Sequence, residues 1–431
     1  MPGDSVKFLE RHRAQLALGM LLLVYAFNFI DRVMLGILVP PIKHEFSLTD
    51  SQLGLLGGTA FALFYTALGI PIGWLADRLN RVWIVTIALA LWSAFTAACG
   101  AAQNFAQLFT ARLGVGIGEA GGVAPAYALI SDYFAPARRA RALAVYSFGI
   151  PLGSAAGILF GGLIAARVNW RAAFVIVGAA GLILAPLFRL WVREPVRGGL
   201  DQASPAAAVG TAGPGAAPRL REVVRLLAGK PSFWYLSLGA ASASVMGYGV
   251  YFWMPSFLVR SYHLTLPQVS VCFSALTFVS GVAGIWLGGA LADRFGSTRR
   301  AAYALVPAVA FLLSVPLYAV GLLAPASLSS LPIFILPMAL ALAWLAPTAS
   351  AIQHLVPAGM RALAAALLLF IINLIGLGAG SYAIGALSDH FATARGTESL
   401  RYAMLSCSGF YLLAAALYGL GARRLAHDWH R

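Results

Sequence analysis

The sequence predicts an all-α integral membrane protein in which twelve transmembrane helices form two pseudo-symmetric bundles of six. Of its 431 residues, 60% are hydrophobic and only 10% are charged, whereas soluble domains carry about 25% charged residues. The mean hydropathy of the whole chain is +0.81, so its apolar residues are too numerous to be enclosed in one soluble core. A soluble fold is therefore excluded, and little length remains for a soluble domain.

Twelve apolar runs are long enough to cross a bilayer, because about 20 helical residues span a hydrocarbon layer of about 30 Å. They fall at roughly 15–40, 51–76, 82–102, 105–134, 142–166, 171–192, 233–259, 268–292, 301–323, 329–354, 360–388 and 400–423. The first run is far longer than the apolar part of a signal peptide and contains Asp31 and Arg32. We therefore expect it to be the first membrane helix.

The basic residues of the chain are distributed as a membrane topology requires. If the N-terminus is cytoplasmic, 22 of the 30 Lys and Arg residues fall on the cytoplasmic side and six on the opposite side. This split follows the positive-inside rule, so we expect both termini in the cytoplasm. The net charge of +15 then needs no nucleic-acid partner. The sequence contains no N-glycosylation sequon, which agrees with a multi-pass protein of the bacterial cytoplasmic membrane.

One stretch interrupts the hydrophobic pattern and divides the chain six helices to six. Residues 193–230 are rich in Gly, Pro, Ser and Ala, a composition typical of a flexible linker. We expect an N-terminal bundle over 1–192, a cytoplasmic linker over 193–230 and a C-terminal bundle over 231–431. Near the end of the linker, the apolar residues of 220–227 fall on one helical face, which predicts a short amphipathic helix at the membrane interface.

A six-residue motif closes the second and the eighth predicted helices. Residues 73–78 read GWLADR and residues 289–294 read GALADR, with the two aspartates 216 residues apart. A separation of about half the chain length indicates an internal duplication. A carboxylate beside guanidinium groups can form an ion pair that is made in one conformation and broken in another. The predicted latch residues are Gly73, Asp77, Arg78, Arg81, Asp293 and Arg294.

Four ionisable residues lie deep within the predicted helices, all of them in the N-terminal half. Asp31 and Arg32 are on the first helix, and Arg112 and Glu119 share one face of the fourth. Charges inside a membrane are costly and mark functional sites. We expect Asp31 or Glu119 to take up and release a proton, and Arg32 or Arg112 to exchange between carboxylates and an anionic substrate. The alternative is an ion-pair cluster that only joins the two helices.

The six C-terminal helices contain no deep charge and offer aromatic and small polar residues instead. The candidates for the wall of a central cavity are Tyr248, Tyr251, Trp344 and Asn373. A cavity with one charged and one aromatic wall suits an amphipathic anion, with its head near the arginines and its tail along the C-terminal helices. The alternative is that these aromatic residues face lipid or neighbouring helices.

Two predicted helices carry glycines in a regular pattern. On the fifth helix Gly149, Gly153, Gly157 and Gly161 recur at every fourth position, and the eighth helix has a shorter series. Glycines on one face let two membrane helices approach closely. We therefore interpret both series as packing surfaces.

Motifs for other kinds of chemistry are absent or misplaced in the sequence. Residues 116–121 fit GxGxxG, but no predicted strand precedes them, so we expect no dinucleotide site. The sequence contains no Walker A, HExxH or GxSxG motif, and its three cysteines lack the spacing of metal ligands. We therefore expect no enzyme activity and no metal or other cofactor. The expected energy source is a proton gradient.

The duplicated GxLADR motif is the signature loop of the major facilitator superfamily, which the whole chain resembles. Stretches of the first half also resemble the spinster-like branch of that superfamily. They are 28–32 (NFIDR), 116–120 (GIGEA), 124–125 (AP), 150–154 (IPLGS) and 192–198 (VREPVRG). The resemblance implies a transporter of lysolipids or sphingoid-base phosphates, in which Asp31, Arg32 and Glu119 act in coupling and substrate handling.

These observations favour a proton-coupled secondary transporter that moves an amphipathic, lipid-like anion by alternating access. Its expected partners are the lipid bilayer and a lysophospholipid or sphingoid-base phosphate, and it is expected to act as a monomer. The alternative is a proton-coupled symporter of small organic anions or a drug efflux antiporter, because the Asp31-Arg32 pair also resembles the first helix of organic-anion symporters. A membrane receptor or a membrane enzyme is less favoured.

Overall fold

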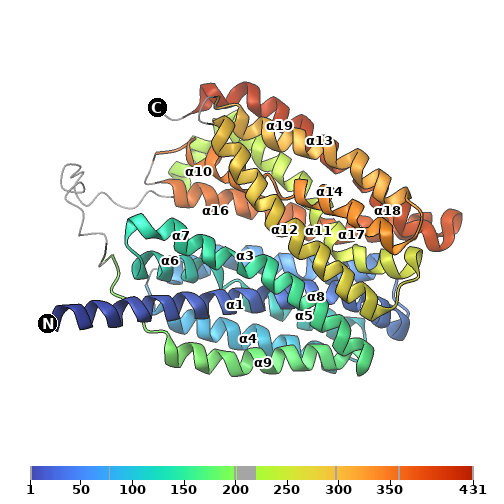
Figure 1. The fold of residues 1–431 in the computed structure, drawn as a ribbon, viewed down its shortest axis with the longest axis horizontal. Helices are drawn as coiled ribbons and strands as arrows, with labels where there is room; N and C mark the ends of the chain where they lie inside the picture. The colour runs from blue at the N-terminus through green and yellow to red at the C-terminus, as the bar shows by residue number, and fades with distance from the viewer. Residues whose placement is uncertain are drawn as a thin grey trace. The chain divides into compact units, whose positions relative to one another are not determined.

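The structure, a computed structural model of the chain, describes residues 2–76, 78–198, 200, 220–296, 299–357 and 360–429. The regular elements in these ranges are helices (Figure 1). The chain forms two compact units. The first comprises Met1–Leu38 and Leu63–Gly215, and the second comprises Val39–Ala62 and Ala216–Arg431. The second unit therefore includes a short segment from the N-terminal part of the sequence.

The first unit contains the greater part of α1 and the helices from α3 to α9. The bounds of its helices are α1 (Pro2–Phe46), α3 (Ala60–Ala76), α4 (Arg81–Ala101), α5 (Phe105–Glu119), α6 (Val123–Tyr133), α7 (Pro136–Ser147), α8 (Gly149–Arg167) and α9 (Trp170–Trp191). Figure 1 shows these helices running side by side.

The second unit begins with the end of α1, the short helix α2 (Asp50–Gly54) and the π-helix η1 (Leu55–Thr59). Its other helices are α10 (Leu220–Ala228), α11 (Pro231–Tyr262), α12 (Leu266–Gly296), α13 (Ala302–Leu323), η3 (Leu328–Phe334), α14 (Ile335–Leu340), α15 (Leu345–Gln353), α16 (Arg361–Ile372), η5 (Asn373–Leu377), α17 (Gly378–Arg395), η6 (Gly396–Glu398), α18 (Ser399–Cys407) and α19 (Gly409–Asp428).

Ten stretches of the described helices are long and apolar enough to cross a membrane. The last of them, Leu363–Asp428, has 66 residues and holds two spans, α16–α17 and α18–α19, since about 20 residues suffice for one. Helix α11 is 32 residues long, but its serines and glycines make it less apolar. The described helices thus correspond to the twelve predicted spans, and the predicted all-helical membrane fold is confirmed.

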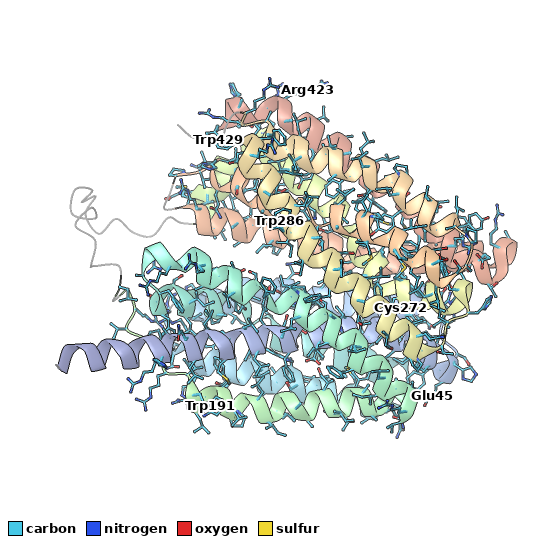
Figure 2. All side chains as sticks on the ribbon, viewed as in Figure 1. Glu45, Trp191, Cys272, Trp286, Arg423 and Trp429 are labelled. Carbon is cyan, nitrogen blue, oxygen red and sulfur yellow. The ribbon has the colours of Figure 1, made fainter. Side chains whose placement is uncertain are left out.

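Large apolar side chains cover the outer faces of the helices. Leu190 and Trp191 on α9 are 71% and 55% exposed, and Trp286 on α12 is 72% exposed. Figure 2 labels the two tryptophans. Such side chains are unfavourable in water and favourable against lipid tails. The outer surface is therefore suited to a bilayer.

The glycines of α8 form a packing surface for α1, in agreement with the predicted role of this series. A Cβ atom added at Gly153 would lie 2.2 Å from the backbone oxygen of Ala26, and one added at Gly157 would lie 2.8 Å from that of Ile30. Because the obstructing atoms are backbone, a side chain here forces the helices apart. The glycines therefore fix the distance between α8 and the helix that carries Asp31 and Arg32.

We expect Gly153→Ala to lower the stability of the protein by about 1–3 kcal/mol, the usual cost of overpacking. Thermal unfolding of the purified protein in detergent measures this. Gly69→Ala on α3 is the matched control, because an added Cβ there meets no atom within 4 Å. Equal melting temperatures for the two variants would contradict the close contact between α8 and α1.

Candidate functional site

The four deep charged residues lie together in the first unit, where α1, α4 and α5 meet. Asp31, Arg112 and Glu119 are each at most 1% exposed. Arg32 Nη2 donates to Glu119 Oε2 at 2.8 Å, which makes an ion pair between α1 and α5. The two side chains are only 10% and 0% exposed. The ion pair is therefore shielded from water, and its Coulomb attraction is stronger than that of a surface pair.

The guanidinium group of Arg32 is held from several sides. Asn28 Oδ1, one helical turn earlier on α1, accepts a hydrogen bond from Arg32 Nη2 at 3.3 Å. The rings of Phe29 and Tyr65 lie 5.0 and 4.8 Å from the guanidinium carbon, within the range of cation–π attraction. These contacts orient Arg32 toward Glu119.

Asp31 has different surroundings from Glu119, although both carboxyl groups are buried. Arg112 Nη1 donates to the backbone oxygen of Asp31 at 3.5 Å. The side chains of Trp92 and Thr96 on α4 face the Asp31 carboxyl group, and Glu119 and Arg112 are its charged neighbours. Within the described residues, no ion pair as close as that between Arg32 and Glu119 is formed by Asp31. The Glu119 carboxyl group is thus in a close ion pair, whereas the Asp31 carboxyl group has, among the described residues, only neutral donors and more distant charges around it.

Small residues at the end of α5 bring Glu119 close to α4. A Cβ atom added at Gly118 would lie 2.6 Å from the backbone nitrogen of Trp92. Glu119 is the last residue of α5, and the chain then turns through Ala120–Gly122 before α6 begins. The close crossing of α4 and α5 therefore places Trp92 beside the two carboxyl-bearing helices. Sequence reasoning did not name Trp92, and it named Asn28 only as part of the NFIDR stretch. Asn28 lies four residues before Arg32 and so shares its helical face.

Arg81, one of the predicted latch residues, forms two ion pairs within the first unit. Its guanidinium group donates to the Asp132 carboxylate on α6, and its Nε donates to Glu194 Oε1 at 2.6 Å. The Glu194 carboxylate also accepts the backbone N–H of Val82 at 3.1 Å. Sequence reasoning gave neither acidic partner a role. The signal that could have found them is their position at the end of an apolar run, Asp132 near the end of 105–134 and Glu194 just after 171–192.

The other predicted latch residues are placed as follows. Arg78 is exposed, and its guanidinium carbon lies 3.8 Å from the ring centre of Trp74. Gly73 lies on α3, where an added Cβ would be 3.9 Å from the Cβ of Ala124. Arg294 is exposed near the end of α12. Asp77 and the side chain of Asp293 lie outside the described residues, so the two aspartates of the latch remain a prediction.

A second charged cluster, which sequence reasoning did not single out, surrounds Asp50 in the second unit. Arg260 on α11 donates to both carboxylate oxygens of Asp50, at 2.6 and 2.7 Å. Lys43 and Ser388 donate to the same carboxylate. Asp389 on α17 accepts the backbone N–H groups of Asp50 and Ser51 at 2.9 and 2.7 Å. We call these residues the Asp50 cluster; it joins the Val39–Ala62 segment to α11 and α17.

The predicted cavity residues of the C-terminal helices are partly accessible, with one exception. Tyr248 and Tyr251 on α11 are half-buried, and the ring of Tyr251 lies 5.8 Å from that of Phe273. Asn373 is half-buried at the start of η5, whereas Trp344 is only 8% exposed. Their role in a substrate cavity stays a prediction.

Known proteins resemble the chain over nearly its full length. An MFS-type efflux pump of Mycolicibacterium smegmatis (strain ATCC 700084 / mc(2)155) is 36% identical over 423 residues, which cover 97% of this chain and 96% of that protein. The sphingosine-1-phosphate transporter SPNS2 of Danio rerio is 29% identical over 440 residues, covering 94% and 85%. A crystal structure of a bacterial homolog of the human lysosomal transporter Spinster, inward-facing and unoccupied, is 32% identical with a TM-score of 0.87 and covers 97% of this chain and 99% of that one.

The model of the Major Facilitator Superfamily matches residues 21–381, most of the chain. The predicted resemblance to spinster-like proteins is confirmed by the named relatives and by the structural match. Proteins of this family move solutes across membranes without transforming them, so the prediction of a transporter and not an enzyme is confirmed. The chain belongs to the Major Facilitator Superfamily.

Proposed function

We propose that this transporter is driven by protons and moves an amphipathic, lipid-like anion by alternating access. The observation that carries the proposal is the buried ion pair between Arg32 and Glu119, with a second carboxyl group, Asp31, beside it. A buried ion pair stabilises a fold poorly compared with apolar packing. Its presence inside a membrane bundle is therefore better explained by function than by stability.

The ion pair provides a direct way to couple a proton to an anion. When Glu119 takes up a proton it becomes neutral, and its attraction for the Arg32 guanidinium group is largely lost. The guanidinium group then needs another anionic partner, and a phosphate or carboxylate of the substrate can supply one in bidentate geometry. Loss of the proton restores Glu119 as the competing partner and expels the substrate head.

The substrate class rests on the relatives and on the aromatic character of the C-terminal helices. One relative is named as a sphingosine-1-phosphate transporter, and such a substrate has a phosphate head and a long apolar tail. In our proposal the head binds near Arg32 and Arg112, and the tail lies along Tyr248, Tyr251, Trp344 and Asn373. We further propose that the chain acts as a monomer in the bacterial cytoplasmic membrane, with both termini in the cytoplasm.

A second function is favoured by a specific observation, the 36% identity to an MFS-type efflux pump. A drug efflux antiporter, or a symporter of small organic anions, would use the same charged cluster without requiring a long tail on its substrate. Dependence of binding on tail length separates these functions from lipid transport.

The Asp50 cluster is a second, independent observation that supports alternating access. It holds Val39–Ala62 to α11 and α17, while α1 and α3 continue from this segment into the first unit. Charge-assisted hydrogen bonds of this kind are strong when made and are lost together when the groups separate. We propose that the cluster is a latch that opens during the transport cycle.

We expect Glu119→Gln and Asp31→Asn each to abolish transport driven by a pH gradient, because neither amide can carry the proton. Uptake of a fluorescent lysophospholipid into proteoliposomes, with and without a pH gradient, measures this. Glu222→Gln, an exposed carboxylate on α10, is the control and should behave like the native protein. Gradient-driven uptake retained in both Glu119→Gln and Asp31→Asn would refute proton coupling by these residues.

Binding of purified protein to a panel of anions tests the substrate class. We expect lysophospholipids and sphingoid-base phosphates to bind more tightly as the tail lengthens, because each buried CH₂ group contributes about 0.8 kcal/mol. Arg32→Gln should weaken binding of every anion in the panel. Binding of short organic anions alone would favour the symporter instead.

We expect Asp50→Asn to destabilise the protein by up to about 3 kcal/mol, because Arg260 and Lys43 lose their shared carboxylate. Arg260→Gln should cost less, because Lys43 and Ser388 still donate to Asp50. The double variant should lose less than the sum of the two changes. Thermal unfolding of all three variants measures this coupling. Glu45→Gln, which changes an exposed carboxylate in the same segment (Figure 2), is the control. Strictly additive losses would argue against the Asp50 cluster as a unit that is made and broken together.

A further inference from the structure

The short helix α10 presents two rows of apolar side chains, of which the described part of the chain covers only one. Val223 and Leu227 are buried, and α10 packs on α11 and α16. Leu220 and Val224, four residues apart, form the neighbouring row, and they are 44% and 43% exposed. This second apolar row is therefore available to a partner.

The uncovered row continues onto the outer face of α11. Helix α10 ends at Ala228, whose backbone oxygen accepts a hydrogen bond from Trp234 Nε1 at 3.4 Å. Trp234 and Leu238 lie one turn apart on α11, and both are exposed. A tryptophan at the beginning of a membrane helix is typical of the boundary between lipid headgroups and tails. Val224, Ala228, Trp234 and Leu238 thus form an apolar strip that leads from α10 along a membrane-spanning helix.

Two arginines follow the apolar row along the surface of α10. Arg221 and Arg225 are both exposed and, being four residues apart, share one face of the helix. Neither forms an ion pair or a side-chain hydrogen bond within the described part of the chain. Glu222, the acidic residue of α10, lies on the side of the helix away from Val224. The positive charge beside the apolar strip is therefore free to pair with an outside anion.

Further basic residues gather at the same end of the second unit. Lys230 donates to the backbone oxygen of Asp428, and Asp428 Oδ2 accepts the backbone N–H of Ser232 at 2.9 Å. These contacts hold the end of α19 beside the beginning of α11. The exposed Arg423 and Arg424 therefore lie at the end of the unit that carries α10 (Figure 2). Their charges add to the positive potential that an anion meets there.

We propose that α10 and the beginning of α11 bind an anionic phospholipid of the surrounding membrane. The lipid phosphate pairs with Arg221 and Arg225, since guanidinium groups bind phosphate in bidentate geometry. The lipid tail lies along the apolar strip. A zwitterionic lipid offers the same tail but no net negative charge, so the arginines favour the anionic lipid. We call this set of residues the α10 surface.

The α10 surface is separate from the proposed substrate site. It belongs to the second unit, whereas Arg32 and Glu119 belong to the first. The lipid bound there is therefore a partner of the folded protein and not its transported substrate. With the topology proposed above, it comes from the cytoplasmic leaflet.

Quenching of tryptophan fluorescence by brominated lipids tests the proposal at a single residue. The purified full-length protein is placed in phosphatidylcholine vesicles that contain the same mole fraction of either brominated phosphatidylglycerol or brominated phosphatidylcholine. The contribution of Trp234 is the difference between the native protein and Trp234→Phe. We expect phosphatidylglycerol to quench Trp234 more strongly than phosphatidylcholine does, and high salt to weaken this preference.

The arginines are tested in the same measurement. Arg221→Gln and Arg225→Gln should each lower the preference for phosphatidylglycerol by about fivefold, the contribution of one arginine near an anionic membrane surface. The double variant should abolish the preference without changing the melting temperature, because both side chains are exposed. Glu222→Gln on the same helix is the matched control and should retain it.

Two further controls separate the α10 surface from other lipid contacts. Trp286 on α12 is also exposed, and its contribution, obtained from Trp286→Phe, should show no preference between the two lipids. Arg32→Gln should leave the preference at Trp234 unchanged. A preference lost in Arg32→Gln but kept in the double arginine variant would place the phosphatidylglycerol at the substrate site and overturn the proposal.

Three other results would also overturn it. Equal quenching of Trp234 by both lipids would mean contact with tails alone. The absence of quenching by either lipid would mean that protein covers the strip. A preference that persists in the double arginine variant would mean that other residues select the lipid. None of these results would affect proton coupling at Arg32 and Glu119, which the transport measurements test separately.

Discussion

The interior of the first unit is organised around one constraint, the cost of keeping Arg32 and Glu119 charged away from water. Their 2.8 Å contact reduces that cost, and it requires α1 and α5 to be held at a fixed separation. Glycines meet this requirement. Those of α8 admit the backbone of α1, and Gly118 lets α5 approach α4. The charged site and the close helix packing are therefore parts of one arrangement.

The fold was largely predictable from the sequence, because the length and hydrophobicity of a membrane span are fixed by the bilayer. Helix α11 was predicted from its apolar residues, although its buried serines, such as Ser237 and Ser256, make it the least apolar of the long spans. The boundaries were less predictable. Helix α1 extends to Phe46, several residues beyond the predicted run. Pro40 and Pro41 lie inside this helix, although proline usually breaks or kinks a helix.

The candidate site was predictable as a set of charges but not as a set of pairs. Sequence position placed Asp31, Arg32, Arg112 and Glu119 in the same half, whereas the choice of partner depends on how the helices are rotated. The Asp50 cluster was missed because its members come from the ends of helices far apart in the sequence, as Asp50 and Arg260 do. A capping box at Thr49 and Gln52 marks the start of α2, but it gives no indication of the ion pairs around it.

Asp31 and Arg32 are adjacent on α1, so their surroundings change together when the helix moves. Neighbouring residues on an α-helix point in directions about 100° apart. Asp31 accordingly faces Trp92 and Thr96 on α4, while Arg32 reaches Glu119 on α5 and Tyr65 on α3. Any rotation or shift of α1 must therefore change the partners of both groups together. In the proposed mechanism, one rigid turn of helix thus links the acid at Asp31 to the guanidinium group at Arg32, without a longer pathway between them.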